Sequence, residues 1–472
     1  MDIKRICCIG AGFVGGPTMA VIALNCPEIE ITVVDNNPER ISAWNNKNLD
    51  LLPVYEPGLK DIIKKVRGKN LFFSDKIDDA IISSQMIFMA VNTPTKIKGK
   101  GKGMAADLTF VEKCAYQIGK VSTDDKIIVE KSTLPVRTAE RIKKILESFD
   151  KPINFEVISN PEFLAEGTAI NDLFKSDRVL IGGDSTIEGK KAVSSLVKIY
   201  SRWIKRNRIL LTNVWSSELI KLASNAMLAQ RISSINALSA FCEKTGANIE
   251  EVSKGIGLDS RIGPKFLKAS VGFGGSCFQK DILNLVYLCE YYNLKEVAEY
   301  WHQVVKINDY QKNRFSNKII ESFNYSIKNK IITILGWAFK KDTNDSRESA
   351  SIYVTEKLLG AGAKIKVYDP MIDEKRVYSD LRIFLEYRGL SYKEIESKIS
   401  SVSVYSDYKA AISKTNAIAI LTEWDEFKSY NWKNLIKKMS LQYKIFDGRN
   451  IINSDDVNSK IYKLGITQFK NI

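Results

Sequence analysis

Apolar and polar residues follow two repeating patterns in the first part of the chain. Runs of consecutive apolar residues, typical of strands buried on both faces, alternate with stretches whose apolar residues recur at helical spacing. The first run, Lys4 to Ile9, leads into the glycine-rich turn Gly10–Gly15, a helical stretch and the strand-like run Ile31–Asp35. This order predicts one complete βαβ unit.

The same alternation continues to about Thr212. Four more strand-like runs lie between helical patterns, at Met86–Val91, Lys126–Glu130, Glu156–Ser159 and Arg178–Gly182. Strands that alternate with helices in this way predict a doubly wound parallel sheet. We therefore expect residues 1–212 to form a Rossmann domain that binds a dinucleotide.

The pattern then changes twice. Helical periodicity alone dominates the next segment and predicts a helical middle domain over residues 213–328. From Ile331 the strand–helix–strand alternation resumes, which predicts a second Rossmann-like domain over residues 329–472. Its turn, Gly336–Lys340, lacks the glycine spacing of the first turn, so the two domains should bind different groups. The predicted fold class is α/β, with two doubly wound parallel-sheet domains joined by a helical domain.

Composition changes this picture little. Apolar residues make up 44% and charged residues 26% of the chain, and no segment approaches the roughly 18 consecutive apolar residues of a membrane-spanning helix. The net charge is +15, but the lysines are dispersed and form no basic arm, so we expect neither a nucleic-acid nor a membrane partner. The seven scattered cysteines form no C-x-x-C pair, which favours reduced thiols and a cytoplasmic location.

The single histidine restricts the possible chemistry. His302 lies in a helical pattern, where a packed or surface helix residue is a simpler interpretation than a catalyst. Ser-His-Asp hydrolysis, multi-histidine metal sites and histidine-based dehydrogenation are all disfavoured, and we expect no metal site.

The turn Gly10-Ala11-Gly12-Phe13-Val14-Gly15 has the G-x-G-x-x-G spacing of dinucleotide-binding turns. It follows a strand, opens a helix and is followed by Asp35 at the end of the next strand. The glycines would let a pyrophosphate approach the helix N-terminus, and Asp35 would bind ribose hydroxyls and repel the 2′-phosphate of NADP. The motif predicts NAD binding, and the alternative is a purely structural glycine turn.

Cys277 differs in its setting from the other cysteines. It follows Gly272-Phe273-Gly274-Gly275-Ser276 and begins a helical stretch, and a helix N-terminus stabilises a thiolate. A nucleophilic role and a plain glycine-rich helix cap both remain open at this stage. Asp281, four residues on, would share the helix face of Cys277 and could orient a water molecule or tune the thiol.

Two further pairs of polar residues have i, i+4 spacing. Lys221 and Asn225 could stabilise a developing alkoxide, although a solvated helix face is the simpler explanation for such a pair taken alone. Glu162 and Glu166 follow the end of a strand, and either could act as a general base.

Eight segments of the sequence resemble those of one known family. In chain order they are GAGFVGG, VNTPTK, EKSTLPVRTAE, NPEFLAEGTAINDL, SSELIKLASNA, KFLKASVGFGGSCFQKD, GWAFKKDTNDSRESAS and FDGR. The chain is similar, over nearly its whole length, to the UDP-glucose 6-dehydrogenase branch of the UDP-glucose/GDP-mannose dehydrogenase family, most closely the animal type. The segment GFGGSCFQKD separates this family from the hydroxyacid dehydrogenases that share the first domain.

The resemblance implies a set of site residues. Cys277 would be the nucleophile that forms a thiohemiacetal and then a thioester. The residues implied to surround it or to assist hydrolysis are Lys221, Asn225, Asp281, Thr133 and Glu162. The residues implied to contact NAD are Gly10, Gly12, Phe13, Val14, Gly15, Asp35, Arg40, Val91, Thr93, Ser132, Thr133, Glu166, Cys277 and Arg347. The residues implied to hold a UDP-sugar are Glu162, Phe163, Leu164, Glu166, Lys221, Asn225, Arg261, Lys268, Phe273, Gly274, Phe339, Lys340 and Arg449. Family members contribute at least one of Arg261 and Arg449 from a neighbouring subunit.

The residues and the resemblance together predict one reaction. NAD would oxidise UDP-glucose by four electrons to UDP-glucuronate, through a covalent intermediate on Cys277. GDP-mannose or a UDP-N-acetylhexosamine is the alternative substrate, and a non-catalytic NAD-binding scaffold is the alternative class of function. The long apolar stripes of the middle domain, together with the resemblance, also predict a homo-oligomer, either a dimer or a hexamer.

Overall fold

The computed structural model describes residues 2–457 and 461–467. The chain divides into two compact units, one ending at Ser224 and the other beginning at Asn225. Helix α9 (Val214–Thr245) contains this boundary. The division into three domains at residues 212 and 328 stays a prediction.

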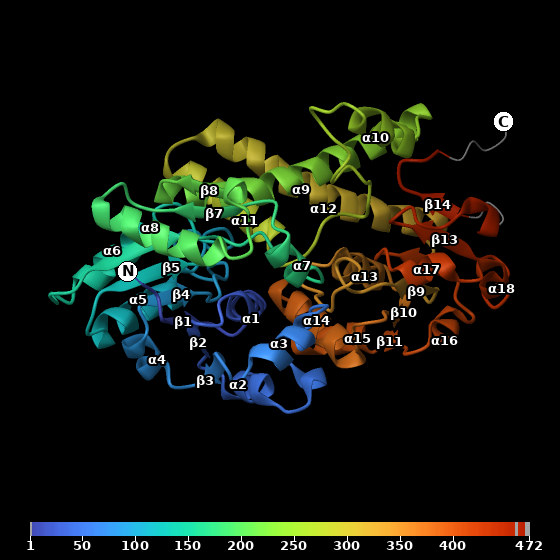
Figure 1. Cartoon of the computed structure of the whole chain (residues 1–472). Coiled ribbons are helices and arrows are strands. Elements are labelled where there is room, and N and C mark those ends of the chain that lie inside the picture. The colour runs from blue at the N-terminus through green and yellow to red at the C-terminus, as the bar shows by residue number, and fades with distance from the viewer. Residues whose placement is uncertain (1, 458–460, 468–472) are drawn as a thin grey trace. The chain divides into compact units, whose positions relative to one another are not determined.

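The first unit contains an eight-stranded sheet in the order β3-β2-β1-β4-β5-β6-β7-β8 (Figure 1). Its strands are β1 (Arg5–Ile9), β2 (Glu30–Val34), β3 (Leu71–Ser74), β4 (Met86–Met89), β5 (Lys126–Glu130), β6 (Phe155–Ser159), β7 (Val179–Gly182) and β8 (Ile209–Thr212). Neighbouring strands run parallel, except that β6 and β7 pair antiparallel through Ser159 and Gly182. The connection after β6 contains one helix, α7 (Ala169–Phe174), and returns the chain to the sheet with β7 running opposite to β6.

Both faces of the first sheet are buried by helices. Successive residues of β1 alternate between two cores, with Ile6 and Cys8 in one and Cys7 and Ile9 in the other. This double burial explains why the strands read as continuous apolar runs in the sequence. The remaining helices of this unit are α1 (Gly15–Asn25), α2 (Pro38–Asn45), α3 (Leu59–Val66), α4 (Ile77–Ser83), α5 (Thr109–Val121), α6 (Thr138–Glu147) and α8 (Ile187–Tyr200), with the short 3-10 turns η1 (Leu49–Leu51) and η2 (Arg206–Arg208).

The second unit contains a six-stranded parallel sheet in the order β11-β10-β9-β12-β13-β14 (Figure 1). Its strands are β9 (Ile331–Leu335), β10 (Lys364–Tyr368), β11 (Val402–Val404), β12 (Ala417–Ile420), β13 (Lys444–Asp447) and β14 (Ile461–Lys463). The helices packed with this sheet are α13 (Ala350–Gly360), α14 (Glu374–Tyr387), α15 (Tyr392–Ile399), α16 (Tyr408–Ile412), α17 (Asp425–Ser429) and α18 (Trp432–Ile436), with the 3-10 turn η3 (Ser454–Val457).

The segment of the chain between β8 and β9 contains helices and loops but no strand. After α9 come α10 (Ile249–Gly257), α11 (Phe278–Tyr291) and α12 (Lys295–Ser322), and α11 packs against α12. The predicted fold class is therefore confirmed: two Rossmann-like sheets and a helical middle region. Within the described residues, no helix is both long and apolar enough to cross a membrane.

Candidate active site

The glycine turn after β1 leaves space beside a helix N-terminus. Gly10 has φ +111°, and a Cβ there would lie 2.3 Å from the carbonyl oxygen of Ala90. A Cβ at Gly15 would lie 1.9 Å from the Gly10 carbonyl oxygen, so this position also requires glycine. A Cβ at Gly12, by contrast, would meet no atom within 4 Å. A pyrophosphate fits such a turn, because the N-terminal end of α1 offers backbone N–H groups to an anion.

Asp35 directly follows β2 and is buried. Its Oδ2 accepts hydrogen bonds from the Ala11 backbone N–H at 2.9 Å and from the Arg40 guanidinium at 3.0 Å, and its Oδ1 accepts one from the Asn37 N–H at 2.9 Å. The carboxylate thus joins the glycine turn to the start of α2 and holds Arg40 in an ion pair. An acidic residue at this position of a Rossmann unit favours NAD, since it binds ribose hydroxyls.

The carboxyl ends of β4 and β5 are joined by side-chain hydrogen bonds. The Ser132 hydroxyl donates to the Val91 carbonyl at 2.6 Å, and the Thr93 hydroxyl donates to the Thr133 carbonyl at 3.1 Å. These four predicted residues therefore lie together. The strand order of the sheet reverses between β1 and β4, which is where open α/β sheets bind their ligands.

The segment after β6 brings Glu162 to Lys221. Oε1 of Glu162 lies 3.2 Å from the Lys221 ammonium, and Oε2 accepts the Leu164 backbone N–H at 2.6 Å. The same ammonium lies 5.3 Å from the ring centroid of Phe163. Lys221 and Asn225 are 4% and 6% exposed, so the explanation of this pair as a solvated helix face is wrong.

In the second unit, Cys277 is the N-cap residue of α11 and is partly exposed. Its thiol lies 3.5 Å from the Ser276 hydroxyl, and its carbonyl accepts the Asp281 backbone N–H at 2.9 Å. The Asp281 carboxylate is buried and accepts a hydrogen bond from the Asn225 side-chain amide at 2.6 Å. The second unit thus combines a thiol at a helix N-terminus with a buried carboxylate one helical turn away.

The loop 270–276 before Cys277 is hydrogen-bonded to α12 and to the segment before α13. The side chain of Asn308, on α12, accepts the Phe273 N–H at 2.8 Å and donates to the Phe273 carbonyl at 3.0 Å. The Gly275 N–H donates to the Arg347 carbonyl at 2.9 Å. The loop that positions the thiol is therefore fixed by its backbone.

Phe339 and Arg449 lie together at the turn after β9. The Arg449 guanidinium donates to the Phe339 carbonyl at 2.8 Å and lies 3.1 Å from the Glu423 carboxylate. A Cβ added to Gly274 would lie 3.0 Å from the Phe339 Cβ, so the predicted substrate residues Gly274, Phe339 and Arg449 are neighbours.

Other predicted residues differ in their exposure. Arg347 is held by the buried Asp345, whose carboxylate accepts two of its guanidinium N–H groups at 2.9 and 2.7 Å. Arg261 pairs with Asp259, its side chain is 87% exposed, and Lys268 is also exposed. Phe13 is exposed, Phe273 is buried, and the half-buried predicted residues are Val14, Leu164, Glu166 and Lys340. The structure thus places Arg261 and Lys268 in solvent on this chain.

The second Rossmann-like turn repeats the aspartate contact of the first but not its glycines. Oδ2 of Asp369 accepts the backbone N–H groups of Trp337 and Ala338 at 2.6 and 3.0 Å and the indole N–H of Trp424 at 3.1 Å. Trp337 is fully buried. The Asp369 carboxylate is therefore engaged by protein donors, as Asp35 is, and the missing glycine spacing is what distinguishes the second turn from the first.

The other six cysteines are weak nucleophiles. Burial raises the pKa of Cys8 to about 12 and the pKa of Cys26 and of Cys114 to about 11. Burial also raises the pKa of Cys7, Cys242 and Cys289. A thiol whose pKa is raised is almost wholly un-ionised at neutral pH, and the thiolate is the reactive form.

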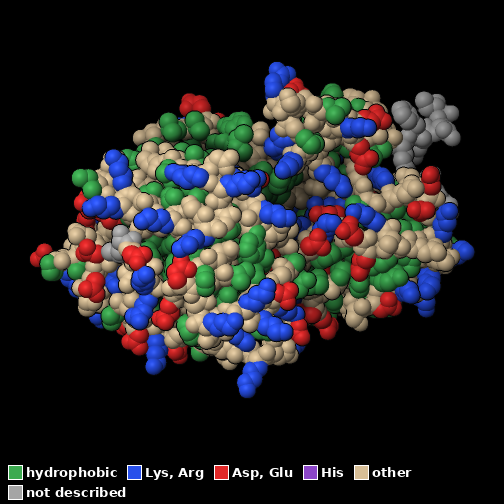
Figure 2. Space-filling model, viewed as in Figure 1, with side chains coloured by type: hydrophobic (Ala, Val, Ile, Leu, Met, Phe, Trp, Pro, Cys, Tyr) green, Lys and Arg blue, Asp and Glu red, His purple; other side chains and the backbone are tan. Residues whose placement is uncertain are grey.

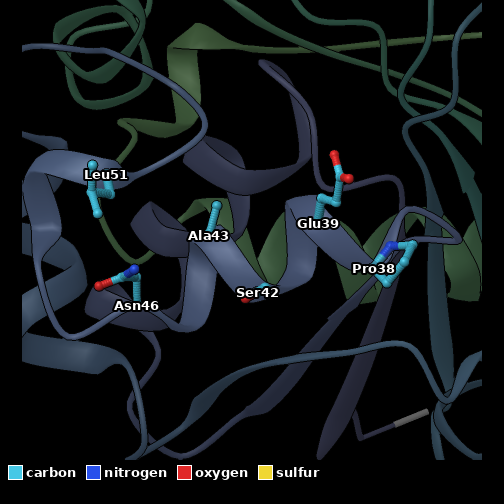
Figure 3. A pocket seen from close by; sticks show the side chains of 6 residues that line it. All are labelled: Pro38, Glu39, Ser42, Ala43, Asn46 and Leu51. Atoms are coloured by element: carbon cyan, nitrogen blue, oxygen red, sulfur yellow. The ribbon is translucent and has the colours of Figure 1, made fainter.

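A pocket of about 520 Å³ on the first unit lies along α2, the helix that carries Arg40 (Figure 3). It is lined by Pro38, Glu39, Ser42, Ala43, Asn46 and Leu51, none of which is a predicted site residue. Figure 2 shows Lys and Arg side chains spread over the visible face with Asp and Glu between them. His302 is half-buried within α12, as predicted for a helix residue, and the described ranges contain no cluster of three or more potential metal ligands from His, Cys, Asp and Glu.

Sequence reasoning missed two sets of positioning residues. Lys131, Asn160 and Tyr200 form a buried hydrogen-bonded group in the first unit. Asn308 fixes the loop before Cys277. One signal was present for Lys131 and Asn160, because each directly follows a buried strand at the edge of the sheet where ligands bind.

Comparisons with known proteins point to one family over nearly the whole chain. Three domain models of the UDP-glucose/GDP-mannose dehydrogenase family match: the NAD binding domain over residues 4–204, the central domain over 215–310 and the UDP binding domain over 333–454. UDP-glucose 6-dehydrogenase 1 of Glycine max is 54% identical over 98% of this chain and 97% of its own length. UDP-glucose 6-dehydrogenase of Mus musculus is 54% identical over 98% and 92%. The structure of a UDP-glucose dehydrogenase from Pyrobaculum islandicum aligns with a TM-score of 0.82 and 27% identity, over 99% of this chain and 98% of that one.

Proposed function

The chain belongs to the UDP-glucose/GDP-mannose dehydrogenase family, and we propose that it oxidises the C6 alcohol of UDP-glucose to the carboxylate of UDP-glucuronate with NAD as oxidant. The observation that carries the proposal is the position of Cys277 at the first turn of α11, behind a loop fixed by its backbone. A partly exposed thiol at a helix N-terminus suits a reaction with a covalent step.

The residues of the glycine turn and its surroundings fit NAD. The pyrophosphate would lie against Gly12, where the turn leaves space, and Asp35 would bind the ribose hydroxyls. The other residues proposed to contact the cofactor are Phe13, Val14, Arg40, Val91, Thr93, Ser132, Thr133, Glu166 and Arg347. When bound, NAD accepts a hydride in each of two oxidations.

The chain's own residues supply the remaining chemistry. Lys221 and Asn225 stabilise negative charge on the C6 oxygen while the hydride leaves. The Cys277 thiolate adds to the aldehyde carbon, and after the second oxidation the carbon is held as a thioester. A water molecule oriented by Thr133 and Glu162 then adds to the acyl carbon. The C–S bond breaks, Cys277 regains its thiolate, and the carboxylate and two protons are released.

A further set of side chains is proposed to hold the UDP-sugar. The proposed contacts are Phe163, Leu164, Glu166, Lys268, Phe273, Gly274, Phe339, Lys340 and Arg449. Because the Arg261 side chain is 87% exposed on its own chain, we assign it to the site of a neighbouring subunit in a homo-oligomer. A light-scattering mass equal to one chain of 53.3 kDa at micromolar concentration would contradict this assembly.

Absorbance at the NADH band tests the activity. Purified protein with excess NAD and limiting UDP-glucose should form two NADH per sugar and release no free aldehyde. GDP-mannose and UDP-N-acetylhexosamines serve as competing substrates, and faster turnover of either would replace UDP-glucose in the proposal. Binding of nucleotide sugars without NADH formation would instead indicate a non-catalytic scaffold. We also propose a cytoplasmic location, supported by the free thiols and testable by cell fractionation.

A further inference from the structure

Lys131 is a buried lysine for which the proposed reaction has no role. It directly follows β5 and is 4% exposed. Its ammonium donates to Oδ1 of Asn160 at 3.1 Å and to the Tyr200 hydroxyl at 3.3 Å. The Tyr200 hydroxyl donates to the same Asn160 oxygen at 2.7 Å. The three side chains therefore form a closed triangle of hydrogen bonds inside the first unit.

Asn160 is fixed on every side by this arrangement. Its side-chain amide donates to the Leu180 carbonyl at 2.7 Å, and its backbone N–H donates to the Glu130 carbonyl at 2.9 Å. Two residues later the chain reaches Glu162, which pairs with Lys221. The short segment that carries Glu162, the carboxylate proposed to orient water, therefore starts at Asn160, which Lys131 and Tyr200 hold in place.

Packing alone does not account for a cation at this position. Burying an ammonium costs several kcal/mol unless hydrogen bonds compensate, whereas an apolar side chain of similar length would fill the space without that cost. Burial lowers the pKa of Lys131 to about 8, while the nearby Glu162 carboxylate opposes this shift. Lys131 therefore lies within electrostatic reach of the Glu162–Lys221 pair, and a charged donor holds the Asn160 oxygen more firmly than a neutral one.

A second buried lysine, on β5 itself, provides the contrast. Lys126, at the other end of β5, is 3% exposed and donates to the carbonyls of Ile82 and Ser84 at 2.9 and 2.6 Å. It joins the end of α4 to the sheet and contacts no proposed site residue through these bonds. Lys126 and Lys131 thus match in residue type, solvent exposure and number of acceptors, but differ in what they hold.

We propose that Lys131 is a positioning residue for thioester hydrolysis, which acts through Asn160 to hold the Glu162 carboxylate in its working orientation. This inference rests on the proposed function. The step concerned consumes one water molecule, breaks the C–S bond to Cys277, returns the thiolate and releases the carboxylate and two protons. A misplaced Glu162 slows this step, so the acylated enzyme accumulates.

The test compares Lys131→Met with the matched control Lys126→Met. Lys131→Met should lower kcat about a hundredfold, with KM for NAD and for UDP-glucose within about threefold of wild type. Intact-protein mass after an acid quench at steady state should show the acyl adduct. Lys126→Met should keep kcat within about threefold and show no adduct, although both variants lose stability. Lys131→Gln, which keeps a neutral donor, should recover part of the loss.

A double-variant cycle tests the route through Asn160. The double variant Lys131→Met/Asn160→Ala should be no slower than Asn160→Ala alone, because the two changes remove the same support of Glu162. If Lys131→Met proves too unstable to study, Lys131→Gln and Tyr200→Phe give the same readouts without deleting a large buried side chain.

Three results would overturn the inference: equal kcat for Lys131→Met and Lys126→Met, slow turnover without an adduct, or multiplicative losses in the cycle. Wild-type protein that forms no NADH from UDP-glucose refutes the proposed function and this inference together. Wild-type turnover with an unaffected Lys131→Met refutes this inference alone.

Discussion

Asn225 donates a 2.6 Å hydrogen bond to the carboxylate of Asp281, and both side chains are buried. Asp281 lies one helical turn from Cys277, whose carbonyl accepts its backbone N–H. A buried carboxylate that has a hydrogen-bond donor keeps its charge at lower cost than an isolated one. The pair therefore has two separable properties, a hydrogen bond that holds α9 to α11 and a negative charge close to the thiol.

Exchanging the two side chains separates these properties. Asp281→Asn alone should lower both the melting temperature and kcat, because two amides face each other and the charge is lost. The double variant Asn225→Asp/Asp281→Asn restores an amide–carboxylate bond with the charge moved to α9. It should regain most of the lost stability, about 1–3 kcal/mol, while kcat remains low. Thermal unfolding and steady-state rates check this, and full recovery of kcat would show that the position of the charge is irrelevant.

Asp35→Ser should relax the discrimination against NADP. The change removes the carboxylate that repels a 2′-phosphate and frees the Arg40 guanidinium, now paired with Asp35 at 3.0 Å, to bind that phosphate. The ratio of kcat/KM for NAD to that for NADP should fall at least about tenfold. The control is Asp35→Ser/Arg40→Ala, which should lose NAD affinity without gaining NADP. Equal use of both cofactors by the wild type would disprove this role of Asp35.

Much of the first unit could be predicted from the sequence, because its signals are local. The glycine turn, the helix after it and Asp35 lie within one βαβ unit, and double burial makes each strand a continuous apolar run. The strand predicted at Met86–Val91 ends at Met89 in the structure, since Val91 belongs to the loop joined to Ser132. The antiparallel pairing of β6 with β7 was not predicted, because strand direction depends on the path of the connection and leaves no pattern in either strand.

The contacts that support the site could not be predicted from the sequence, although the positions of Lys131 and Asn160 after buried strands were visible in it. Lys131 contacts partners 29 and 69 residues away, and Asn308 contacts Phe273 at a separation of 35. No periodicity or spacing links residues so far apart in the chain. Lys221 and Asn225 show the same limit in another form, because their i, i+4 spacing suits a solvated face and a buried one equally well.

The carboxyl groups of Glu130 and Glu218 predict a pH-dependent stability. Both side chains are buried, and burial raises the pKa of Glu218 from 4.5 to about 7. Burial and the nearby Glu218 charge also raise the pKa of Glu130 well above its usual value. Between these values the folded chain binds more protons than the unfolded chain, so stability falls as pH rises from about 4.5 through about 7. Glu130→Gln keeps a neutral donor and should flatten this fall.

Differential scanning calorimetry at pH 5.5 and pH 8 measures the effect. Glu156→Gln is the control, because Glu156 on β6 also has a pKa raised by burial but is less deeply buried and should change the pH profile less. An unchanged slope in Glu130→Gln would mean that the pair does not bind the extra proton.

Cys277→Ala should abolish four-electron turnover while leaving NAD binding intact. The variant removes the nucleophile but not the glycine turn or Asp35, which lie in the other unit. NADH formation should fall by several orders of magnitude, and the Kd for NAD measured by calorimetry should stay within about threefold. Cys289→Ala, a buried thiol on the same helix, should retain turnover. Conversion of UDP-glucose to UDP-glucuronate at near wild-type rate by Cys277→Ala would disprove the covalent route.

Alkylation distinguishes Cys277 from the other partly exposed thiol, Cys114. Burial raises the pKa of Cys114 to about 11, so at pH 7.5 its thiolate fraction is about one in several thousand. Cys277 caps the N-terminus of α11, where the helix dipole favours the thiolate. Iodoacetamide should therefore inactivate the wild type with carbamidomethylation of Cys277 and not of Cys114, as read by peptide mass mapping. UDP-glucose should slow the labelling because the sugar covers the thiol, whereas Cys114→Ala should be inactivated at the wild-type rate. Labelling of Cys114 before Cys277, or inactivation that UDP-glucose leaves unchanged, would place the reactive thiol outside the substrate site.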